Sequence, residues 1–220
     1  MSPLRKPPRV GVLSLQGDFA CHRGALESLG AEAVRVTLSR DLEGVEALVM
    51  PGGESTTMLR LLAATGLRAP VEAFVRARPV LGTCAGLILL GRPQGSQGLP
   101  APPFAVLDVA VERNAYGRQI DSFHEDLDVP VVGARFHGVF IRAPRITQVG
   151  KGVEVIARRD AEREVVGVRA GHVVGLCFHP ELTSDLRLHR WFLTEVAQLD
   201  LPSGTTAERA PAAAAPWSRS

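Results

Sequence analysis

A cysteine between two glycines is the residue of this chain best suited to covalent chemistry. Residues 82–86 read Gly-Thr-Cys-Ala-Gly, and they connect the apolar residues 79–81 to the apolar residues 87–90. A strand that turns sharply into a helix is typical of a nucleophile elbow, in which small neighbours permit a strained turn. We therefore interpret Cys84 as a nucleophile that attacks a carbonyl carbon.

A histidine and a glutamate two residues apart are candidates for the base and its orienting group. They belong to the segment 176–181, Leu-Cys-Phe-His-Pro-Glu. In an extended segment, residues two apart point to the same side, so Glu181 could fix the tautomer and orientation of the His179 ring. A base is close to its nucleophile in space, not in sequence. The pattern predicts a Cys84, His179 and Glu181 triad; a histidine at a strand end beside a solvated glutamate is the alternative.

A Gly-Gly turn is the second element of the predicted site. Residues 51–55, Pro-Gly-Gly-Glu-Ser, leave an apolar strand and enter a helix that begins near Thr56. Glycines let backbone N–H groups approach a ligand closely, and one preorganised donor contributes about 10²–10³ in rate. We interpret the turn as an oxyanion hole; an ordinary turn capped by Ser55 or Thr56 is the alternative.

Two segments after the elbow contain arginines. Residues 113–119 begin with Arg113, and residues 138–144 contain Arg142. A guanidinium group pairs bidentately with a carboxylate, which makes both side chains candidates for binding an acidic group of a substrate. Solvation at the protein surface is the alternative for each of them.

The composition is that of an ordinary globular protein. The chain has 220 residues, of which 45% are hydrophobic and 22% are charged, and this is enough for one well-buried domain. Its formal net charge is only +2, and Lys and Arg are scattered without a basic block. Nucleic acid is therefore not an expected partner.

The cysteines and the N-terminus bear on the compartment of the protein. The three cysteines stand far apart, and an odd number argues for reduced thiols and against a disulfide framework. The basic N-terminus leads into a strand-like segment, and no apolar run approaches the ~18 residues of a membrane span. We therefore expect a cytoplasmic protein that is neither exported nor inserted in a membrane.

The sequence predicts neither a metal site nor a cofactor. The six histidines show no H-E-x-x-H spacing. Cys21 and Cys177 form no C-x-x-C pair, which is the common spacing of zinc-binding cysteines.

The first half of the chain alternates short apolar runs with helical segments. We expect strands at residues 9–15, 33–36, 47–50 and 80–81, and helices at residues 21–29, 56–65 and 70–76. This order predicts parallel β-α-β units, and hence an α/β fold with an open, mostly parallel, doubly wound sheet. Its catalytic groups should lie outside the carboxyl ends of the strands.

The second half is richer in short β-like runs. We expect strands at residues 106–111, 136–141, 153–157, 165–169 and 172–177, which form an antiparallel extension of the sheet, and a closing helix at residues 186–199. Residues 201–220 are rich in Ala and Pro and have no packable face, so we expect a disordered tail after a domain of residues 1–200.

Six segments resemble the glutaminase subunits of pyridoxal 5'-phosphate synthase, a family of class I (triad) glutamine amidotransferases. The resemblance covers most of residues 9–199 and rests on residues 11–17, 51–58, 82–90, 112–123, 138–144 and 178–183. The elbow and the His-Pro-Glu motif mark the superfamily, whereas the segments P-G-G-E-S-T-T-M and R-N-A-Y-G-R-Q-I-D-S-F point to this family. One departure is Cys21-His22, where the family usually has Glu-His in a region that tends to face the synthase subunit.

The resemblance implies a flavodoxin-like sheet and a role for each site residue. Cys84 would be the nucleophile, His179 the base and Glu181 its orienter. The residues that would hold glutamine are Gly53, Glu54, Ser55, Arg113, Ile141 and Arg142. The backbone N–H groups of Gly53 and Ala85 would form the oxyanion hole. The resemblance also implies a partner, a barrel-shaped synthase subunit that receives the ammonia through a tunnel.

Other functions stay open at this point. A glutaminase subunit of another synthase, such as that of histidine biosynthesis, is one alternative, and a Cys-His peptidase or deglycase on a similar fold is another. The family-specific segments argue against both. A non-catalytic binding module would usually have lost Cys84, His179 or Glu181, and this chain keeps all three.

Overall fold

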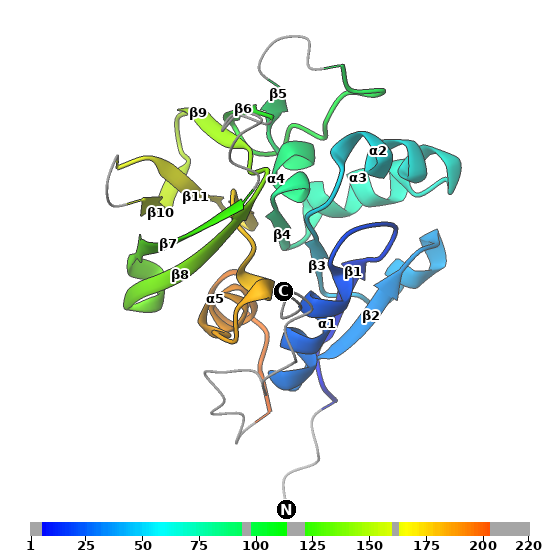
Figure 1. Ribbon diagram of the computed structural model, residues 1–220. Coiled ribbons are helices and arrows are strands. Elements are labelled where there is room, and N and C mark those ends of the chain that lie inside the picture. The colour runs from blue at the N-terminus through cyan, green and yellow to red at the C-terminus, as the bar shows by residue number, and fades with distance from the viewer. Residues whose placement is uncertain (1–5, 94–97, 114–121, 160–162, 203–220) are drawn as a thin grey trace, which may run out of the picture.

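A nine-stranded mixed sheet forms the centre of the protein. The computed structural model describes residues 6–93, 98–113, 122–159 and 163–202, and the strand order in the main sheet is β2-β1-β3-β4-β12-β11-β10-β7-β8 (Figure 1). The bounds of these strands, in sheet order, are Glu32–Val36, Arg9–Leu13, Ala47–Met50, Val80–Thr83, Val173–Leu176, Val165–Ala170, Glu154–Arg159, Ser122–Val129 and Ala134–Ile141.

The first five strands of this order are parallel. The chain runs from β1 outward to β2 and then returns to β3 on the other side of β1, which is the flavodoxin-like order with its switch point between β1 and β3. Every residue of β3 and β4 is buried. This is expected of central parallel strands, because helices cover both faces of the sheet. The predicted open parallel sheet is confirmed.

The remaining strands pair antiparallel, so the predicted antiparallel extension is also confirmed. Strands β7 and β8 form its outer hairpin, closed by the turn Pro130–Val132 with Gly133 in the left-handed region. The sequence does not predict β7, because its residues S-F-H-E-D-L-D-V are mostly polar and contain no continuous apolar run. Its first five residues keep side chains on both faces at least partly exposed.

A second, three-stranded sheet corrects the prediction for residues 106–111. The strand there begins only at Val109, and it belongs to a separate sheet formed by β5 (Arg92–Pro93), β6 (Val109–Glu112) and β9 (Arg145–Val149). Apolar character marks a strand but does not identify its partner, since pairing is decided by tertiary contacts. Strand β9 was not predicted either, because four of its five residues are exposed.

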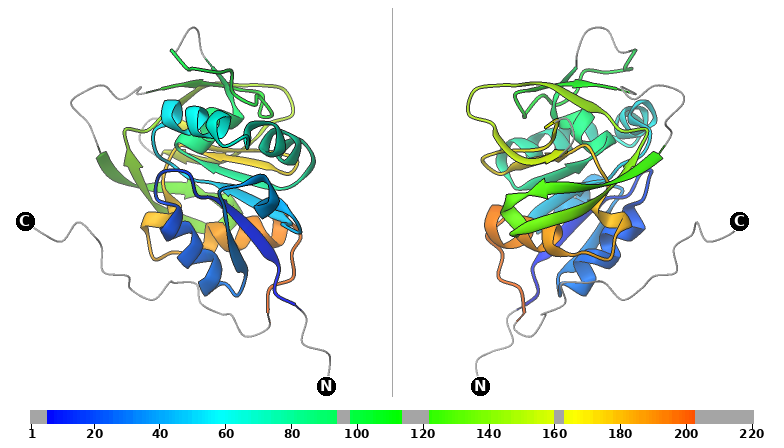
Figure 2. Two further views of the ribbon diagram at one scale, coloured as in Figure 1. Left: turned by 90° about the vertical axis from the view of Figure 1, so that its right-hand side faces the viewer. Right: turned by 60° about the vertical axis from the view of Figure 1, so that its left-hand side comes forward.

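Helices cover both faces of the main sheet. Helices α2 (Ser55–Ala64), α3 (Arg68–Ala77) and α4 (Ala85–Leu90) lie on one face, and α1 (Phe19–Ser28) and α5 (Arg187–Trp191) lie on the other (Figures 1 and 2). The closing helix predicted at residues 186–199 is divided in the structure. The α-helical part, α5, ends at Trp191, and Phe192–Val196 forms a π-helical turn. None of the helices in the described ranges is both long and apolar enough to cross a membrane.

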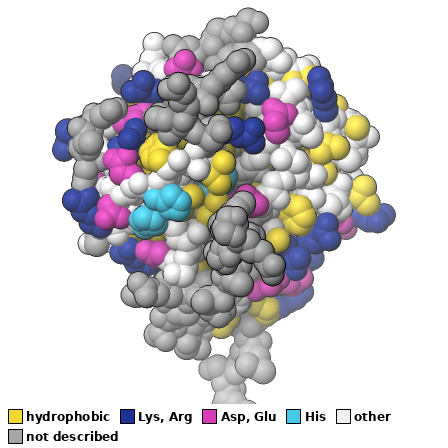
Figure 3. Space-filling view, in the orientation of Figure 1, with side chains coloured by type: hydrophobic (Ala, Val, Ile, Leu, Met, Phe, Trp, Pro, Cys, Tyr) yellow, Lys and Arg dark blue, Asp and Glu magenta, His cyan; other side chains and the backbone are white. Residues whose placement is uncertain are grey.

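The described surface shows no large region of one charge on the face drawn in Figure 3. Basic and acidic side chains are interspersed there, as the small net charge of +2 leads one to expect. The predicted tail lies outside the described residues except for Leu201 and Pro202.

Candidate active site

The backbone at Cys84 has the strained geometry of a nucleophile elbow. Cys84 lies between β4 and α4 with φ 48° and ψ −103°, a region that residues other than glycine rarely adopt. A Cβ atom at Gly86 would collide with the carbonyl oxygen of Met50, and one at Gly82 would lie 2.5 Å from a methyl group of Leu90. The two glycines around Cys84 are therefore required by close packing.

The carboxyl ends of three neighbouring strands bring the predicted site residues together. Gly82 of β4 stands opposite Met50 of β3 on one side and Gly175 of β12 on the other. The ladder continues beyond the strand end, where the Cys84 N–H donates to the Leu176 carbonyl at 2.8 Å. The turns that follow these strands contain the Gly-Gly pair, the cysteine and the His-Pro-Glu motif.

His179 and Glu181 form a buried hydrogen-bonded pair. The distance from His179 Nδ1 to Glu181 Oε1 is 2.8 Å, and the two side chains are 4% and 0% exposed. The carboxylate can only accept, so Nδ1 carries the hydrogen and Nε2 is the nitrogen that remains for chemistry. The predicted extended backbone at this motif is wrong, because Pro180–Leu182 is a 3₁₀ turn that brings the carboxylate to the ring.

Burial and charge act in opposite directions on this pair. Burial alone would lower the pKa of His179, but the charge of Glu181, its hydrogen bond to Nδ1 and the nearby Cys84 raise it well above its ordinary value. Burial alone would raise the pKa of Glu181, but the His22 and His179 rings hold it well below its ordinary value. The pair is therefore arranged to stabilise an imidazolium beside a carboxylate.

The free nitrogen of His179 lies in a buried position near the thiol. His179 Nε2 is buried and makes no hydrogen bond to any residue in the described ranges. Cys84 is close enough to raise the pKa of His179, and its Sγ lies 3.9 Å from the Ile141 carbonyl oxygen. A cysteine nucleophile is activated by a proton acceptor within reach of its thiol, and Nε2 of His179 is placed to act as that acceptor.

The antiparallel extension holds the backbone of the His-Pro-Glu segment. The His179 N–H donates to the Val139 carbonyl of β8 at 2.8 Å. The preceding residue, Phe178, is fully buried and packs against Phe136 and Phe140 of the same strand, with ring centroids 5.9 and 5.8 Å away. The position of the imidazole therefore depends on β8.

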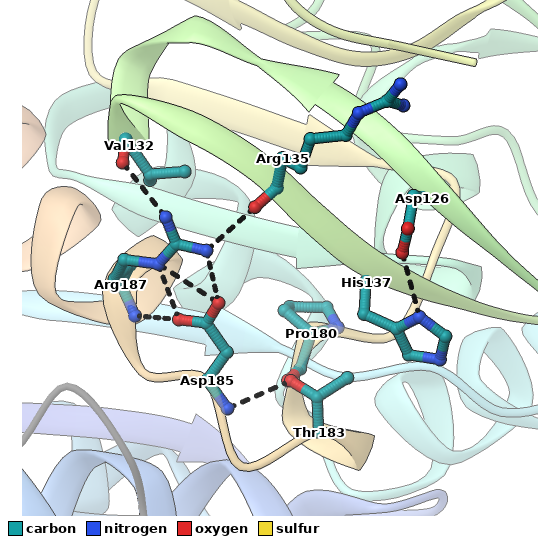
Figure 4. A network of polar contacts seen from close by, with 8 residues as sticks. All are labelled: Asp126, Val132, Arg135, His137, Pro180, Thr183, Asp185 and Arg187. Carbon is teal, nitrogen blue, oxygen red and sulfur yellow. Dashed lines mark hydrogen bonds and ion pairs between the residues drawn. The ribbon is translucent and has the colours of Figure 1, made fainter. Parts of the chain in front are cut away.

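A polar network fixes the other end of the same turn (Figure 4). The Thr183 hydroxyl donates to the Pro180 carbonyl at 3.0 Å and accepts from the Asp185 N–H at 3.2 Å. Arg187 pairs with Asp185 at 2.6 Å, and it also donates to the carbonyls of Val132 and Arg135 at 3.3 and 2.8 Å. The network connects the His-Pro-Glu turn to the start of α5 and to the β7–β8 hairpin.

The Gly-Gly turn lies against the imidazole. Gly53 has φ 134°, which only glycine adopts without strain, and a Cβ atom at Gly52 would collide with the His179 ring. The Gln16 side chain accepts a hydrogen bond from the Glu54 N–H at 2.8 Å and so holds the turn from the end of β1. The oxyanion role of the Gly53 and Ala85 N–H groups stays a prediction.

Glu54 caps α2, so its side chain is engaged within the protein. It accepts hydrogen bonds from the N–H groups of Thr56 and Thr57 at 3.0 and 2.7 Å, and from the Thr57 hydroxyl at 2.8 Å. Partial burial opposes ionisation, but these bonds outweigh it and lower the pKa of Glu54 to about 2. The alternative that Ser55 or Thr56 caps this helix is wrong, because Ser55 is its buried first residue.

The two candidate arginines are in different environments. The Arg113 side chain is only 17% exposed and lies 3.3 Å from Glu54 Oε1 and 3.2 Å from Thr56 Oγ1, so simple surface solvation does not describe it. Arg142 follows β8, is exposed, and has φ 40° in the left-handed region. Strained backbone of this kind is concentrated at functional sites. The contacts of both side chains with a substrate stay predictions.

The structure adds a residue that the sequence did not single out. His22 is completely buried, and its Nε2 lies 3.2 Å from Glu181 Oε2. The sequence placed His22 only beside Cys21, as part of a departure from a family pattern. Nothing in the local sequence connects α1 with the His-Pro-Glu turn, since the contact arises from tertiary packing.

Three side chains in the site are of types that can bind a metal. Asp18, His179 and Glu181 each offer a ligand atom, and these atoms lie within 4.8 Å of one another. His179 Nδ1 and Glu181 Oε1 are already joined by their hydrogen bond. This bond accounts for most of the proximity, and we assign no metal to the group.

Comparisons with known proteins agree with this arrangement. The sequence profile of the SNO glutamine amidotransferase family matches residues 12–198. The chain is 50% identical over 187 residues to pyridoxal 5'-phosphate synthase subunit PdxT of Pelotomaculum thermopropionicum, covering 84% of this chain and 93% of that one. For PdxT of Thermus thermophilus the identity is 53% over 187 residues, covering 84% and 95%.

A solved structure gives the same result for the fold. The chain superposes on a crystal structure of a glutamine amidotransferase with a TM-score of 0.79 and 48% identity, covering 86% of this chain and 99% of that one. The family profile spans well over half of the chain, and the fold agrees with it. The protein therefore belongs to the SNO family of glutamine amidotransferases.

Proposed function

We propose that this protein is the glutaminase subunit of a pyridoxal 5'-phosphate synthase. It hydrolyses L-glutamine to L-glutamate and ammonia, and it delivers the ammonia to a synthase subunit. The observation that supports the chemistry most directly is the buried hydrogen bond of 2.8 Å between His179 and Glu181, next to the strained elbow at Cys84. Relatives about half identical to this chain carry the name of that synthase subunit, which supports the biosynthetic role.

The reaction begins with attack of the Cys84 thiolate on the carboxamide carbon of glutamine. The His179 imidazolium donates its Nε2 proton to the departing nitrogen, the C–N bond breaks, and ammonia leaves a thioester on Cys84. The raised pKa of His179 keeps the ring protonated for this step. His179 then takes a proton from water, the hydroxide attacks the thioester, and glutamate leaves as the thiolate and the imidazolium are restored.

Glutamine binding follows the same assignment. The backbone N–H groups of Gly53 and Ala85 stabilise the oxyanion of each tetrahedral intermediate. Arg113 and Arg142 supply positive charge for the α-carboxylate of the substrate. Glu54 acts through the turn that its side chain caps, because its carboxylate is already occupied by three hydrogen bonds. Ser55 and Ile141 line the pocket.

The cellular context is part of the same proposal. Residues 1–200 form the amidotransferase domain, and the protein works in the cytoplasm with its synthase partner. Ammonia is protonated in bulk water at neutral pH, so direct transfer between subunits preserves the nucleophilic form. No observation favours a synthase of another pathway over this one.

The experiment that tests the proposal measures glutamate and ammonia release with purified synthase subunit present. Cys84→Ala should abolish release, whereas Cys177→Ala should keep most of it. Cys177 is the matched control because burial raises the pKa of its thiol, which keeps it neutral and unreactive. Full activity of Cys84→Ala, or labelling of Cys21 in preference to Cys84 by a glutamine-like electrophile, would contradict the assignment.

A further inference from the structure

We propose that His22 is a positioning residue of the glutaminase reaction. It holds the second oxygen of Glu181, and this carboxylate in turn keeps the His179 ring oriented toward Cys84. The inference rests on the proposed function. It concerns a side chain on α1 that contacts neither the thiol nor the substrate pocket directly in the described structure.

The two oxygens of Glu181 are divided between two histidines. Oε1 lies 2.8 Å from His179 Nδ1, and Oε2 lies 3.2 Å from His22 Nε2. The Glu181 and His22 side chains are both 0% exposed, so the second oxygen is closed off from bulk solvent. Oε2 has no hydrogen-bond partner of regular geometry among the described residues, so the approach of the His22 ring to 3.2 Å is the polar contact on this side of the carboxylate. His22 is therefore the group that compensates the charge on this side of the carboxylate.

The contacts of His22 fix which of its nitrogens carries hydrogen. Nε2 lies 3.2 Å from Thr83 Oγ1 as well as near Glu181, and Nδ1 lies 3.0 Å from His189 Nε2. An ionised carboxylate can only accept, so His22 presents an N–H at Nε2. In the neutral ring, Nδ1 then accepts from the Nε2–H of His189. His22 is consequently held from three sides by buried partners.

The second histidine supports this tautomer. His189 is completely buried, and this burial is the main reason that its pKa falls to about 3, so it stays neutral. When its hydrogen is on Nε2, its Nδ1 is a bare lone pair. His189 Nδ1 is a buried ring nitrogen without a partner among the described residues. A lone pair is tolerated there better than an orphaned N–H would be.

Three elements and the nucleophile strand meet at His22. His22 comes from α1, Glu181 from the 3₁₀ turn and His189 from α5, while Thr83 is the last residue of β4, immediately before Cys84. His22 therefore links Thr83, which precedes the nucleophile, to Glu181, which orients the base. This link fixes the nucleophile and the base relative to each other. The titratable groups that face this cluster are Glu181 and His179, with Asp18, Cys21 and Cys84 beside them, and Asp185 from the side of His189.

Loss of the His22 N–H should affect catalysis more than binding. In His22→Leu, one oxygen of Glu181 faces apolar side chains, so the carboxylate turns or takes up a proton. We expect kcat to fall by about 10-fold or more, a part of the ~10²–10⁴-fold that general acid–base catalysis contributes, with KM within about 3-fold. The acid limb of the kcat profile should move to higher pH, because Glu181 is protonated more easily without His22.

Two matched variants separate positioning from a general loss of structure. His22→Gln places an amide N–H near the former Nε2, and it should recover most of kcat and the original acid limb. His172→Leu removes another partly buried imidazole, whose Nε2 lies 3.3 Å from the Val75 carbonyl outside the site, and it should leave kcat unchanged. Thermal melting of each variant shows that the measured protein is folded.

A second measurement, which needs no glutamine, tests the proposal if His22→Leu folds poorly. The rate of Cys84 alkylation by iodoacetamide as a function of pH reports the thiolate that His179 stabilises, and it can be measured on His22→Gln and on the folded fraction of His22→Leu. The proposal predicts an altered profile for the leucine variant and a normal one for the glutamine variant.

The outcomes distinguish this inference from the function on which it rests. Unchanged kcat and pH profile in folded His22→Leu, or an equal loss in His22→Gln and His22→Leu, would overturn the role of His22. If Cys84→Ala is inactive in the same assay, the glutaminase mechanism stands even then. If Cys84→Ala keeps its activity, the proposed function fails first.

Discussion

Replacing Glu181 by glutamine tests the role of the buried carboxylate in the reaction. The substitution keeps the size of the side chain and removes its charge, next to a ring nitrogen 2.8 Å away. The His179 ring is positively charged when it donates a proton to the leaving ammonia, so the carboxylate stabilises that state. We expect Glu181→Gln to lower kcat strongly while the protein still folds.

The size of the effect follows from the geometry. For charge centres about 4 Å apart at an effective dielectric of about 20, the attraction is about 4 kcal/mol. Since each 1.36 kcal/mol is tenfold in rate, losing it should lower kcat by about 10³. The pH profile should change as well. Without Glu181, burial dominates and the pKa of His179 falls, so the alkaline limb, where the imidazolium is lost, should move to lower pH.

Steady-state glutamate release between pH 5 and 10, with saturating synthase subunit, is the appropriate assay. Glu164→Gln is the matched control, because Glu164 is a buried carboxylate paired at 2.7 Å with Arg145 of β9 and at 2.8 Å with Arg159 of β10, neither of which belongs to the triad. It should lower the melting temperature and leave kcat within about 3-fold. A Glu181→Gln enzyme with near-normal kcat and an unmoved alkaline limb would refute the reasoning.

Three further predictions concern binding, the tail and the partner. Arg142→Ala and Arg113→Ala should each raise KM about 10- to 100-fold, as loss of a charge-assisted contact worth ~1.5–3 kcal/mol implies, whereas exposed Arg60→Ala should not; unchanged KM in both would return them to surface charges. Deletion of residues 204–220 should change neither melting temperature nor activity, because this segment has no periodic apolar positions, and a large fall in melting temperature would contradict this. The subunit should be weakly active alone and about 10²-fold faster with its synthase partner, since the glycine turn at residues 52–53 can rest with its N–H groups turned away; equal rates would remove this gating.

The parts of the fold that could be predicted from the sequence are those with local causes. Buried parallel strands are continuous apolar runs, and for this reason β3 and β4 were placed correctly. The elbow could be recognised because a strained residue between close-packed backbones demands glycine on both sides, as Gly82 and Gly86 show. The family-specific loops then led to the correct family.

The parts that could not be predicted depend on contacts between distant segments. Strands β7 and β9 expose many of their side chains, so hydrophobic pattern alone does not mark them. The side chain of Glu54 caps α2, a role that its position before Ser55 permits but that the sequence alone does not distinguish from a contact with a ligand. The contact of His22 with Glu181 joins α1 to a turn from the far end of the chain, and no spacing rule connects them.

The antiparallel extension has a direct part in the site. The His179 N–H is held by the Val139 carbonyl of β8, and the carbonyl of Ile141, at the end of the same strand, lies 3.9 Å from Cys84 Sγ. On the other side, the Gly-Gly turn after β3 packs against the His179 ring. The base is therefore clamped between the parallel strands that carry the nucleophile and the hairpin that extends the sheet. Because β8 contacts both the base and the thiol, a shift of this hairpin would change their separation, and the hairpin is as much a part of the catalytic geometry as the elbow itself.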